Sequence, residues 1–314
     1  MIISASRRTD IPAFYATWFM KRLRAGYCLV PNPFNRNQVS RVSLKPQDVD
    51  VIVFWTRDPV PMMPHLKELD QRGYRYYFLY TVVNYPRPID PKSPSLAFSL
   101  KAFRRLAEYV GPEKVIWRYD PILFSSLTGP KFHEETFRYI AKTLRGSVKR
   151  SVISTVNLYR KTRRRLKHLY RDGVELAGCN GEPLSDLMKT LACTARECDM
   201  TIYSCAETPD LKGYGIPPGK CVDNMYIKDT FGIDVTHRKD PSQREACGCV
   251  VSKDIGMYDS CLYGCVYCYA TSSFELAKMN HERHDPDSPS LIGFYEFEAN
   301  RMVKNKGGIL QDSV

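Results

Sequence analysis

The stretch Val51-Ile52-Val53-Phe54-Trp55 is a continuous run of β-prone apolar residues. A strand with one face in water alternates polar and apolar residues. An uninterrupted run is instead expected for a strand buried on both faces of a parallel sheet. A helical pattern follows at residues 61–72 and is closed by Gly73. This part of the chain therefore predicts one strand-then-helix unit of an α/β fold.

The same succession recurs before and after this unit. Strands are expected at residues 2–5, 51–55, 76–83, 115–118, 151–156 and 201–204, and helices at 14–23, 61–72, 96–110, 132–144, 160–170 and 185–198. Strands that alternate with helices indicate βαβ units and a parallel sheet. Right-handed crossovers would curl this sheet into a barrel or wind it as an open sheet, and the periodicity does not separate the two.

The composition changes after residue 213, where the chain becomes rich in glycine, proline and cysteine. We expect three segments: an α/β domain of six strand–helix units at 1–213, a Cys-rich segment packed on it at 214–285, and a polar tail at 286–314. A helix is expected at 272–282, and the chain after Arg283 is expected to be unpacked.

Three cysteines stand at spacings of four and three in Cys261-Leu262-Tyr263-Gly264-Cys265-Val266-Tyr267-Cys268. Thiolates are soft ligands that favour iron–sulfur clusters, zinc and copper(I). Three thiolates hold three corners of a cubane cluster and leave the fourth iron open to a substrate or a second cofactor. The same spacing would also place three core cysteines on one helix face. Five cysteines within residues 247–268 favour a metal site.

Four further cysteines, Cys205, Cys221, Cys247 and Cys249, are candidates for an auxiliary cluster or a zinc ion, which also takes four thiolates. They could equally supply a fourth ligand to the main cluster, and Cys205 and Cys221 could simply be buried thiols. The remaining cysteines show no ligand pattern and are interpreted as structural; they are Cys28, Cys179, Cys193 and Cys198.

Polar and charged side chains follow every expected strand. In barrels, functional groups gather at the carboxyl ends of the strands, and arginine suits bidentate binding of carboxylate or phosphate. The alternative is that such loops are polar in any case, and that pairs such as Arg118 with Asp120 only brace them. We expect a shared cofactor-binding rim formed by Arg7, Arg8, Asp10, Arg57, Arg118, Asp120, Asn157 and Glu207.

The chain of 314 residues carries a formal net charge of +12. This charge is compatible with nucleic acid or another anionic partner but does not establish one. Residues 160–167 include six basic residues, a pattern more typical of a solvated helix face than of a binding site. No secretion signal and no apolar run of about 20 residues is evident. Eleven cysteines then indicate reduced thiols or metal ligands, so a cytoplasmic protein without a membrane is expected.

Nearly all of residues 1–285 resembles the bacterial and archaeal family known as domain of unknown function 1848. The Cys261–Cys268 spacing resembles the CxxxCxxC signature of the radical S-adenosylmethionine (radical SAM) superfamily, with Tyr267 before the last cysteine. Tyr269 and Ala270 fit its spore photolyase-like branch. The family resemblance lies in Ser6-Arg7-Arg8-Thr9-Asp10-Ile11-Pro12, Phe54-Trp55-Thr56-Arg57-Asp58-Pro59, Trp117-Arg118-Tyr119-Asp120-Pro121-Ile122, Cys205-Ala206-Glu207 and the final cysteine cluster.

The radical SAM resemblance implies a partial (β/α)6 barrel, which agrees with the six expected units. It implies a [4Fe-4S] cluster on Cys261, Cys265 and Cys268, with S-adenosylmethionine on the open iron. Reductive cleavage would give methionine and a 5′-deoxyadenosyl radical that takes hydrogen from an unknown substrate. The electron donor would be a protein such as a ferredoxin or flavodoxin. The four rim arginines would bind anionic groups, and Asp120 and Glu207 would bind amino or ribose groups.

The position of the motif departs from that superfamily, where CxxxCxxC usually follows the first strand. Either the order is permuted, or the C-terminal segment folds back over the barrel. We expect residues 247–268 to pack against the carboxyl ends of the strands with the three sulfurs facing the rim and Cys205 nearby, and the helix at 272–282 to pack on the flank. The alternative function is a non-enzymatic zinc- or iron–sulfur-binding protein with a basic surface that could contact nucleic acid.

Overall fold

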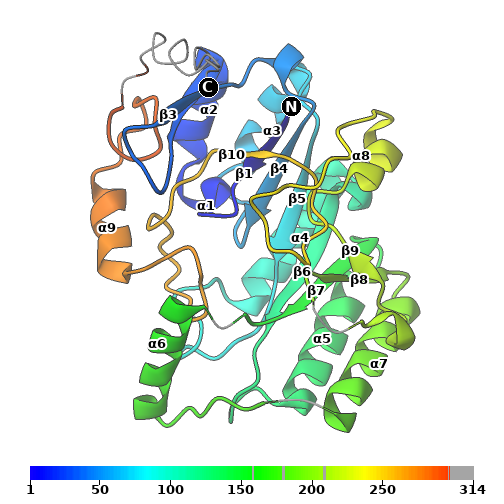
Figure 1. The fold of residues 1–314 in the computed structure, drawn as a ribbon. Helices are drawn as coiled ribbons and strands as arrows, with labels where there is room; N and C mark the ends of the chain where they lie inside the picture. The colour runs from blue at the N-terminus through cyan, green and yellow to red at the C-terminus, as the bar shows by residue number, and fades with distance from the viewer. Residues whose placement is uncertain (158, 179–180, 208–209, 296, 298–314) are drawn as a thin grey trace, which may run out of the picture.

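The computed structural model describes residues 1–157, 159–178, 181–207, 210–295 and 297. Its main element is an eight-stranded parallel sheet, curled as a half-barrel, with the spatial order β10-β1-β4-β5-β6-β7-β8-β9 (Figure 1). The strands are β1 (Ile2–Ala5), β4 (Val51–Thr56), β5 (Tyr76–Thr81), β6 (Val115–Ile122), β7 (Arg150–Thr155), β8 (Thr201–Cys205), β9 (Pro218–Gly219) and β10 (Lys253–Asp254). The predicted α/β class and parallel sheet are confirmed.

Helices connect the strands along the chain, as the alternating pattern predicts. They are α1 (Ile11–Phe14), α2 (Ala16–Ala25), α3 (Leu66–Gln71), α4 (Leu96–Val110), α5 (Pro130–Leu144), α6 (Arg160–Leu169), α7 (Glu182–Glu197), α8 (Asn224–Phe231) and α9 (Phe274–Glu282). Short 3-10 turns lie at Pro46–Asp48, Met63–His65, Pro112–Lys114, Tyr170–Asp172 and Lys212–Tyr214.

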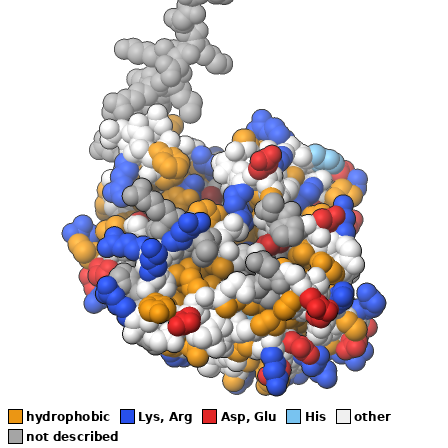
Figure 2. Space-filling view, turned by 60° about the horizontal axis from the view of Figure 1, so that its bottom comes forward, with side chains coloured by type: hydrophobic (Ala, Val, Ile, Leu, Met, Phe, Trp, Pro, Cys, Tyr) orange, Lys and Arg blue, Asp and Glu red, His pale blue; other side chains and the backbone are white. Residues whose placement is uncertain are grey.

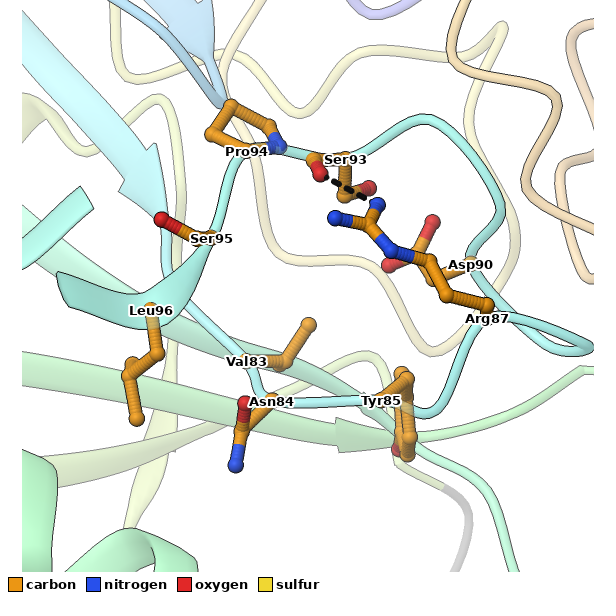
Figure 3. A pocket seen from close by; sticks show the side chains of 9 residues that line it. All are labelled: Val83, Asn84, Tyr85, Arg87, Asp90, Ser93, Pro94, Ser95 and Leu96. Atoms are coloured by element: carbon orange, nitrogen blue, oxygen red, sulfur yellow. Dashed lines mark hydrogen bonds between the residues drawn. The ribbon is translucent and has the colours of Figure 1, made fainter. Parts of the chain in front are cut away.

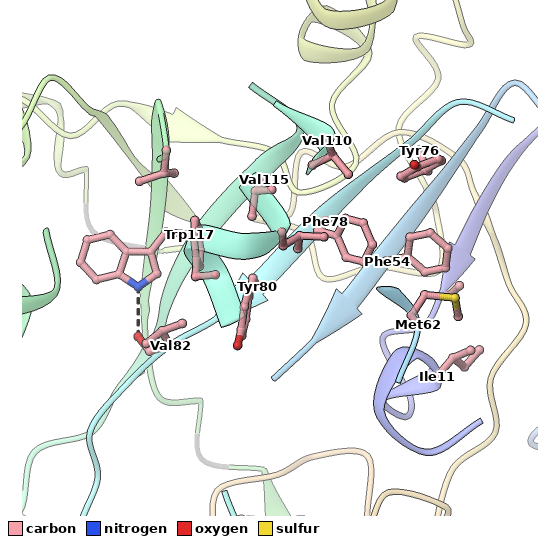
Figure 4. Close-up of a cluster of buried hydrophobic side chains, with 14 of the residues drawn as sticks. Ile11, Phe54, Met62, Tyr76, Phe78, Tyr80, Val82, Val110, Val115 and Trp117 are labelled. Carbon is pink, nitrogen blue, oxygen red and sulfur yellow. Dashed lines mark hydrogen bonds between the residues drawn. The ribbon is translucent and has the colours of Figure 1, made fainter. Parts of the chain in front are cut away.

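Strand β4 is buried on both faces, as its uninterrupted apolar sequence predicts. Ile52 and Phe54 face the helices and belong to the main hydrophobic core, where Phe54 stacks on Phe78 at a centroid distance of 4.8 Å (Figure 4). Val51 and Val53 face the other way and join a second core. Side chains from residues 222–250, including α8, pack against that second face.

The second core fixes the path of the chain after β9. Its members from this part of the chain include Val222, Ile227, Val235 and Val250, packed on the inward side chains of β1, β4, β5, β6 and β7. In Figure 1 this segment, coloured yellow, crosses the sheet before it reaches β10. Burial of this apolar surface holds the Cys-rich segment on the sheet.

The structure adds elements that the sequence patterns did not predict. Strands β9 and β10 extend the sheet at its two edges, and an antiparallel hairpin of β2 (Tyr27–Pro31) and β3 (Val39–Ser43) lies outside it. The six expected strands all form. The sheet therefore contains eight strands where six were expected.

The expectation that the chain after Arg283 is unpacked is wrong for residues 288–292. Ser288, Ser290, Leu291 and Ile292 are buried. The indole Nε1 of Trp18 donates to the Ser288 carbonyl at 3.0 Å, and this segment also receives a backbone hydrogen bond from β2. The tail expected beyond residue 297 lies outside the described residues. No helix in the described part of the chain is long and apolar enough to cross a membrane.

A buried histidine in α5 is expected to make the stability of the fold depend on pH. His133 accepts from the Tyr119 hydroxyl at Nδ1 over 2.9 Å, and its Nε2 donates to the Leu123 carbonyl over 3.1 Å, because a carbonyl can only accept. Burial lowers the pKa of His133 to about 4, from an ordinary value of 6.5. The folded state therefore binds this proton less readily than the unfolded state does.

We expect the neutral His133 side chain to contribute fully to the free energy of unfolding above pH 6.5. That contribution should be lost as the pH falls toward 4. Between neutral pH and about pH 5 the loss should be about 2 kcal/mol in the free energy of unfolding. Urea denaturation at the two pH values measures it. In the His133→Leu variant, the difference in the free energy of unfolding between the two pH values should be smaller by about 2 kcal/mol. An unchanged difference would assign the pH dependence to other groups.

Candidate metal and cofactor site

The cysteine loop leaves the sheet at strand β10, which lies at the sheet edge beside β1. The two strands are parallel, with Ile3 opposite Lys253 and Ser4 opposite Asp254. The Asp254 carboxylate accepts hydrogen bonds from Ser4 Oγ at 2.9 Å, Ser6 Oγ at 2.6 Å, the Arg7 amide at 2.8 Å and the Gly256 amide at 3.0 Å. One carboxylate thus joins the loop after β1 to the segment that carries Cys261, Cys265 and Cys268.

The three motif cysteines lie near one another in this loop. Burial, followed by the charge of Cys268, raises the pKa of Cys261. Burial also raises the pKa of Cys265, to which Cys268 and Cys261 contribute further. Gly264 between them has a φ of 72°, a left-handed conformation that glycine adopts without strain. The chain therefore turns at Gly264, and the three thiols interact with one another electrostatically.

Arg57 at the end of β4 binds this loop directly. Its Nη1 lies 3.2 Å from Cys265 Sγ, 2.5 Å from Asp90 Oδ2 and 2.5 Å from Ser93 Oγ. The Tyr267 hydroxyl donates to the same Asp90 oxygen at 2.9 Å. Burial would raise the pKa of Asp90, but the Arg57 charge and hydrogen bonds hold it below its usual value. Arg57 and Asp90 are thus a buried ion pair that fixes the middle cysteine.

Asp10, expected at the rim, shapes it through the backbone. Its Oδ2 accepts from the Arg57 amide at 2.7 Å, and its Oδ1 accepts from the Ala13 amide at 3.0 Å and caps α1. Burial raises the pKa of Asp10 to about 7. Asp10 therefore positions the turn that directs Arg57 at Cys265.

Arg7 and Arg118 both lie over the ring of one tryptophan. Their guanidinium carbons lie 5.1 and 4.8 Å from the Trp55 ring centroid. Arg118 also pairs with Asp120, which accepts a hydrogen bond from Ser154. The expected Arg118–Asp120 pair is present. Three buried donor atoms here have no hydrogen-bond partner: Arg7 Nη2, Trp55 Nε1 and Arg118 Nε.

The other expected rim residues are placed differently. Glu207 accepts from the Thr155 amide and hydroxyl, both at 2.7 Å, and burial raises its pKa. Arg8 donates to the Gly256 carbonyl at 3.4 Å and lies over the Tyr258 ring. Asn157 is exposed after β7. Glu207 and Arg8 thus hold neighbouring segments, whereas Asn157 faces solvent.

One residue of the basic run at 160–167 does not lie on a solvated helix face. Arg165 Nε donates to the Val266 carbonyl at 3.1 Å, and its two terminal nitrogens donate to the carbonyls of Cys268 and Thr271. Arg164 is exposed, as the pattern predicts. In Figure 1 the cysteine loop accordingly lies beside the start of α6.

We expect Arg165→Met to loosen the cysteine loop, because it removes three donors and leaves three carbonyls without their partner. The released thiols should react with a thiol reagent several-fold faster than in the unaltered protein. Arg164→Met removes the same charge from the exposed face and should leave the rate unchanged. Equal rates for the two variants would mean that Arg165 does not hold the loop.

A cavity of about 180 Å³ lies beside the Arg57–Asp90 pair (Figure 3). Arg87 donates to the Ser93 carbonyl at 2.8 Å across it. Asp90 contributes a buried Oδ1 that has no partner. The cavity is lined by Val83, Asn84, Tyr85, Arg87, Asp90, Ser93, Pro94, Ser95 and Leu96. A polar ligand could enter here next to the residues that hold Cys265.

The four further cysteines also lie close together, on the inner face of the sheet. Cys205 Sγ and Cys221 Sγ are 3.4 Å apart, and Cys249 Sγ accepts from the Val222 amide at 3.4 Å. All four cysteines of this group, Cys205, Cys221, Cys247 and Cys249, are buried. Among those interpreted as structural, Cys28 and Cys198 are buried, Cys193 is exposed, and Cys179 lies outside the described residues.

A family model described as "Domain of unknown function (DUF1848)" matches residues 2–270. The chain belongs to the DUF1848 family. The matched region runs from β1 through the cysteine loop, so it includes the rim, the three motif cysteines and the group of four. A comparison with curated proteins finds no match.

The face of this DUF1848 protein in Figure 2 shows where basic side chains lie on one side of the molecule. On the face shown in Figure 2, basic side chains lie among acidic and hydrophobic ones, and the described residues there form no continuous basic surface. The excess of positive charge therefore does not point to an extended nucleic-acid contact on this face.

Sequence reasoning missed three residues that organise the site. Asp90 lies in a proline-rich loop, and Asp254 is half of a two-residue strand, so neither falls in a recognisable pattern. Arg165 was hidden within a run of similar residues. The spacing between Arg165 and the apolar Leu166 and Leu169 could have indicated which arginine borders the buried face.

Proposed function

We propose that this protein is an iron–sulfur enzyme of the radical SAM type. Cys261, Cys265 and Cys268 would bind three irons of a [4Fe-4S] cluster. The observation that carries the proposal is the place of their loop: it follows β10, which is an edge strand of the sheet and pairs in parallel with β1. The motif usually follows the first strand in that superfamily. A permuted chain order, with a partial barrel closed by a Cys-rich cap at residues 247–268, accounts for its late position in the sequence.

The donor set fits such a cluster. Arg57 donates to the buried Cys265 sulfur, and the Ala270 amide donates to Cys268 Sγ at 3.3 Å, and both contacts favour thiolates. No three metal-ligating side chains in the described part of the chain already surround one position for a single ion. Loading of the proposed cluster would therefore require the motif cysteine side chains to move.

The chain's own residues would bind and shield the reacting groups. The bound cluster would supply one electron to S-adenosylmethionine. Arg57 is occupied by Asp90 and Cys265, so we assign it to orienting the loop and not to an anionic ligand. Asp90 Oδ1 is proposed to accept a hydrogen bond from the amino group of S-adenosylmethionine at the cavity, and Glu207 or Asp120 a ribose hydroxyl.

The decisive experiment is the formation of 5′-deoxyadenosine. The protein is reconstituted with iron and sulfide without oxygen, reduced with dithionite, and incubated with S-adenosylmethionine with or without cell extract. We expect 5′-deoxyadenosine by mass spectrometry, and none when dithionite is omitted. A fully loaded protein that forms no 5′-deoxyadenosine under either condition would disprove this function.

Metal analysis separates this proposal from a non-enzymatic metal-binding role. Protein purified without oxygen should contain iron and acid-labile sulfide that depend on the motif cysteines. Stoichiometric zinc at these cysteines, without iron or sulfide, would favour a structural metal site.

A further inference from the structure

Four cysteines from three separate segments meet behind the rim. Cys205 ends β8, Cys221 follows β9, and Cys247 and Cys249 precede β10. Strands β8 and β9 pair with Cys205 opposite Gly219, which brings Cys221 next to Cys205 at a sulfur–sulfur distance of 3.4 Å. We propose that Cys205, Cys221, Cys247 and Cys249 form a second metal site, which binds one thiophilic ion such as Zn²⁺ through four thiolates.

The sulfurs already interact as a group. All four cysteines belong to one buried cluster of side chains on this face of the sheet. The Val222 amide donates to the Cys249 sulfur at 3.4 Å, and Val222 directly follows Cys221, whose sulfur contacts that of Cys205. Buried thiols that gather in this way are placed to lose their protons to a metal ion.

Two arginines supply positive charge to this group. Arg7 lies near Cys249, and Arg118 lies near Cys221 and Cys205, so each charge interacts with the thiols. Arg7 Nη2 is buried and has no hydrogen-bond partner in the described structure. Four thiolates around a divalent ion carry two negative charges in excess, which these two arginines would balance.

The burial of the group favours a closed site for a single ion. Cys205, Cys221, Cys247 and Cys249 are 9%, 1%, 7% and 2% exposed. The 3.4 Å distance between the Cys205 and Cys221 sulfurs is nearer to the spacing of thiolates around one tetrahedral ion than to their spacing around a cubane. Since no three ligands in the described chain already surround one position, binding requires deprotonation and rotation of these side chains. Four protein ligands leave no open position, so the ion would be structural.

Such an ion would cross-link β8 to the segment that leads into β10. That segment crosses the sheet from Val222 to Val250 without another strand of the sheet. Fixing both of its ends would hold β10, and with it the loop of Cys261, Cys265 and Cys268.

The test uses the full chain with Cys261, Cys265 and Cys268 all replaced by Ser, which removes the first site. After chelation and desalting without oxygen, Co²⁺ is added as a spectroscopic substitute for Zn²⁺. We expect about one Co²⁺ per chain, with the intense sulfur-to-cobalt absorption of a tetrahedral thiolate site. Zn²⁺ should displace it. Adding Cys249→Ser should abolish the absorption, and adding Cys193→Ser at the exposed cysteine should not.

Absence of cobalt–thiolate absorption in the triple variant would overturn the proposal, and so would its persistence after Cys249→Ser. A disulfide between Cys205 and Cys221 in the freshly isolated protein, seen by mass spectrometry without reductant, would also overturn it. Because the triple variant lacks the motif cysteines, the result does not depend on whether the protein cleaves S-adenosylmethionine.

Discussion

Replacing Cys265 by Ser is expected to abolish both cluster binding and 5′-deoxyadenosine formation. Changes in residues that only support a metal ligand weaken binding about 10- to 100-fold, so loss of a ligand itself should exceed about 100-fold. Cys265 is also the cysteine held by Arg57, at 3.2 Å. A serine hydroxyl is a poor ligand for iron in this setting because it is not ionised at neutral pH.

Iron, acid-labile sulfide and visible absorption are measured on the reconstituted variant, with 5′-deoxyadenosine as the activity. Cys193→Ser is the matched control, since Cys193 is exposed on α7 and far from the motif in sequence. Circular dichroism confirms that both variants are folded. Full cluster loading of Cys265→Ser would contradict the assignment of this cysteine as a ligand.

The second large effect is expected at the Arg57–Asp90 ion pair. The side chains of Arg57 and Asp90 are 12% and 2% exposed. Removing one partner of a buried pair leaves the other charge without compensation, which costs about 3–5 kcal/mol. Arg57→Met should therefore lower the free energy of unfolding of the metal-free chain by about that amount, and Arg57→Met with Asp90→Asn should recover much of the loss.

Urea denaturation of the metal-free chain measures these differences. Arg24→Met is the control, because Arg24 pairs with Glu68 at the surface, where one pair contributes less than about 1 kcal/mol. If Arg57→Met lowered the free energy of unfolding as little as Arg24→Met does, the Arg57–Asp90 pair would be effectively solvated. A double variant no more stable than Arg57→Met would show that the unpaired carboxylate is not the cause.

The central strands could be predicted because burial on both faces leaves an unmistakable pattern. Val51–Thr56 and Tyr76–Thr81 are runs of apolar residues, and the helices between strands end at glycines such as Gly111. These signals are local, so a single sequence contains them. The position of the rim could be predicted from these strands, because the carboxyl ends of parallel strands lie at one edge of the sheet.

The parts that could not be predicted depend on contacts between distant residues. Strand β10 has only Lys253 and Asp254, and side-chain hydrogen bonds to the β1 loop hold it in place instead of an apolar pattern. Nothing in the spacing shows that Cys205 meets Cys221 or that Asp90 meets Arg57. The sequence of residues 288–292 predicts a polar tail. In the structure these residues pack against the fold, with Leu291 buried and a backbone hydrogen bond from β2 to Pro289.

The place of β10 after all other strands of the sheet in the sequence has a consequence for biosynthesis. A ribosome releases residues in sequence order, so β1 and β4 to β9 emerge before Cys261, Cys265 and Cys268. The cysteine loop can then dock onto strands that already exist, and no nascent chain carries the motif without its scaffold. A translation product that stops early, or is cut before β10, would retain most of the sheet and never acquire the motif. Under the proposed cluster assignment, the cluster ligands would therefore be synthesised only after the sheet that shelters them.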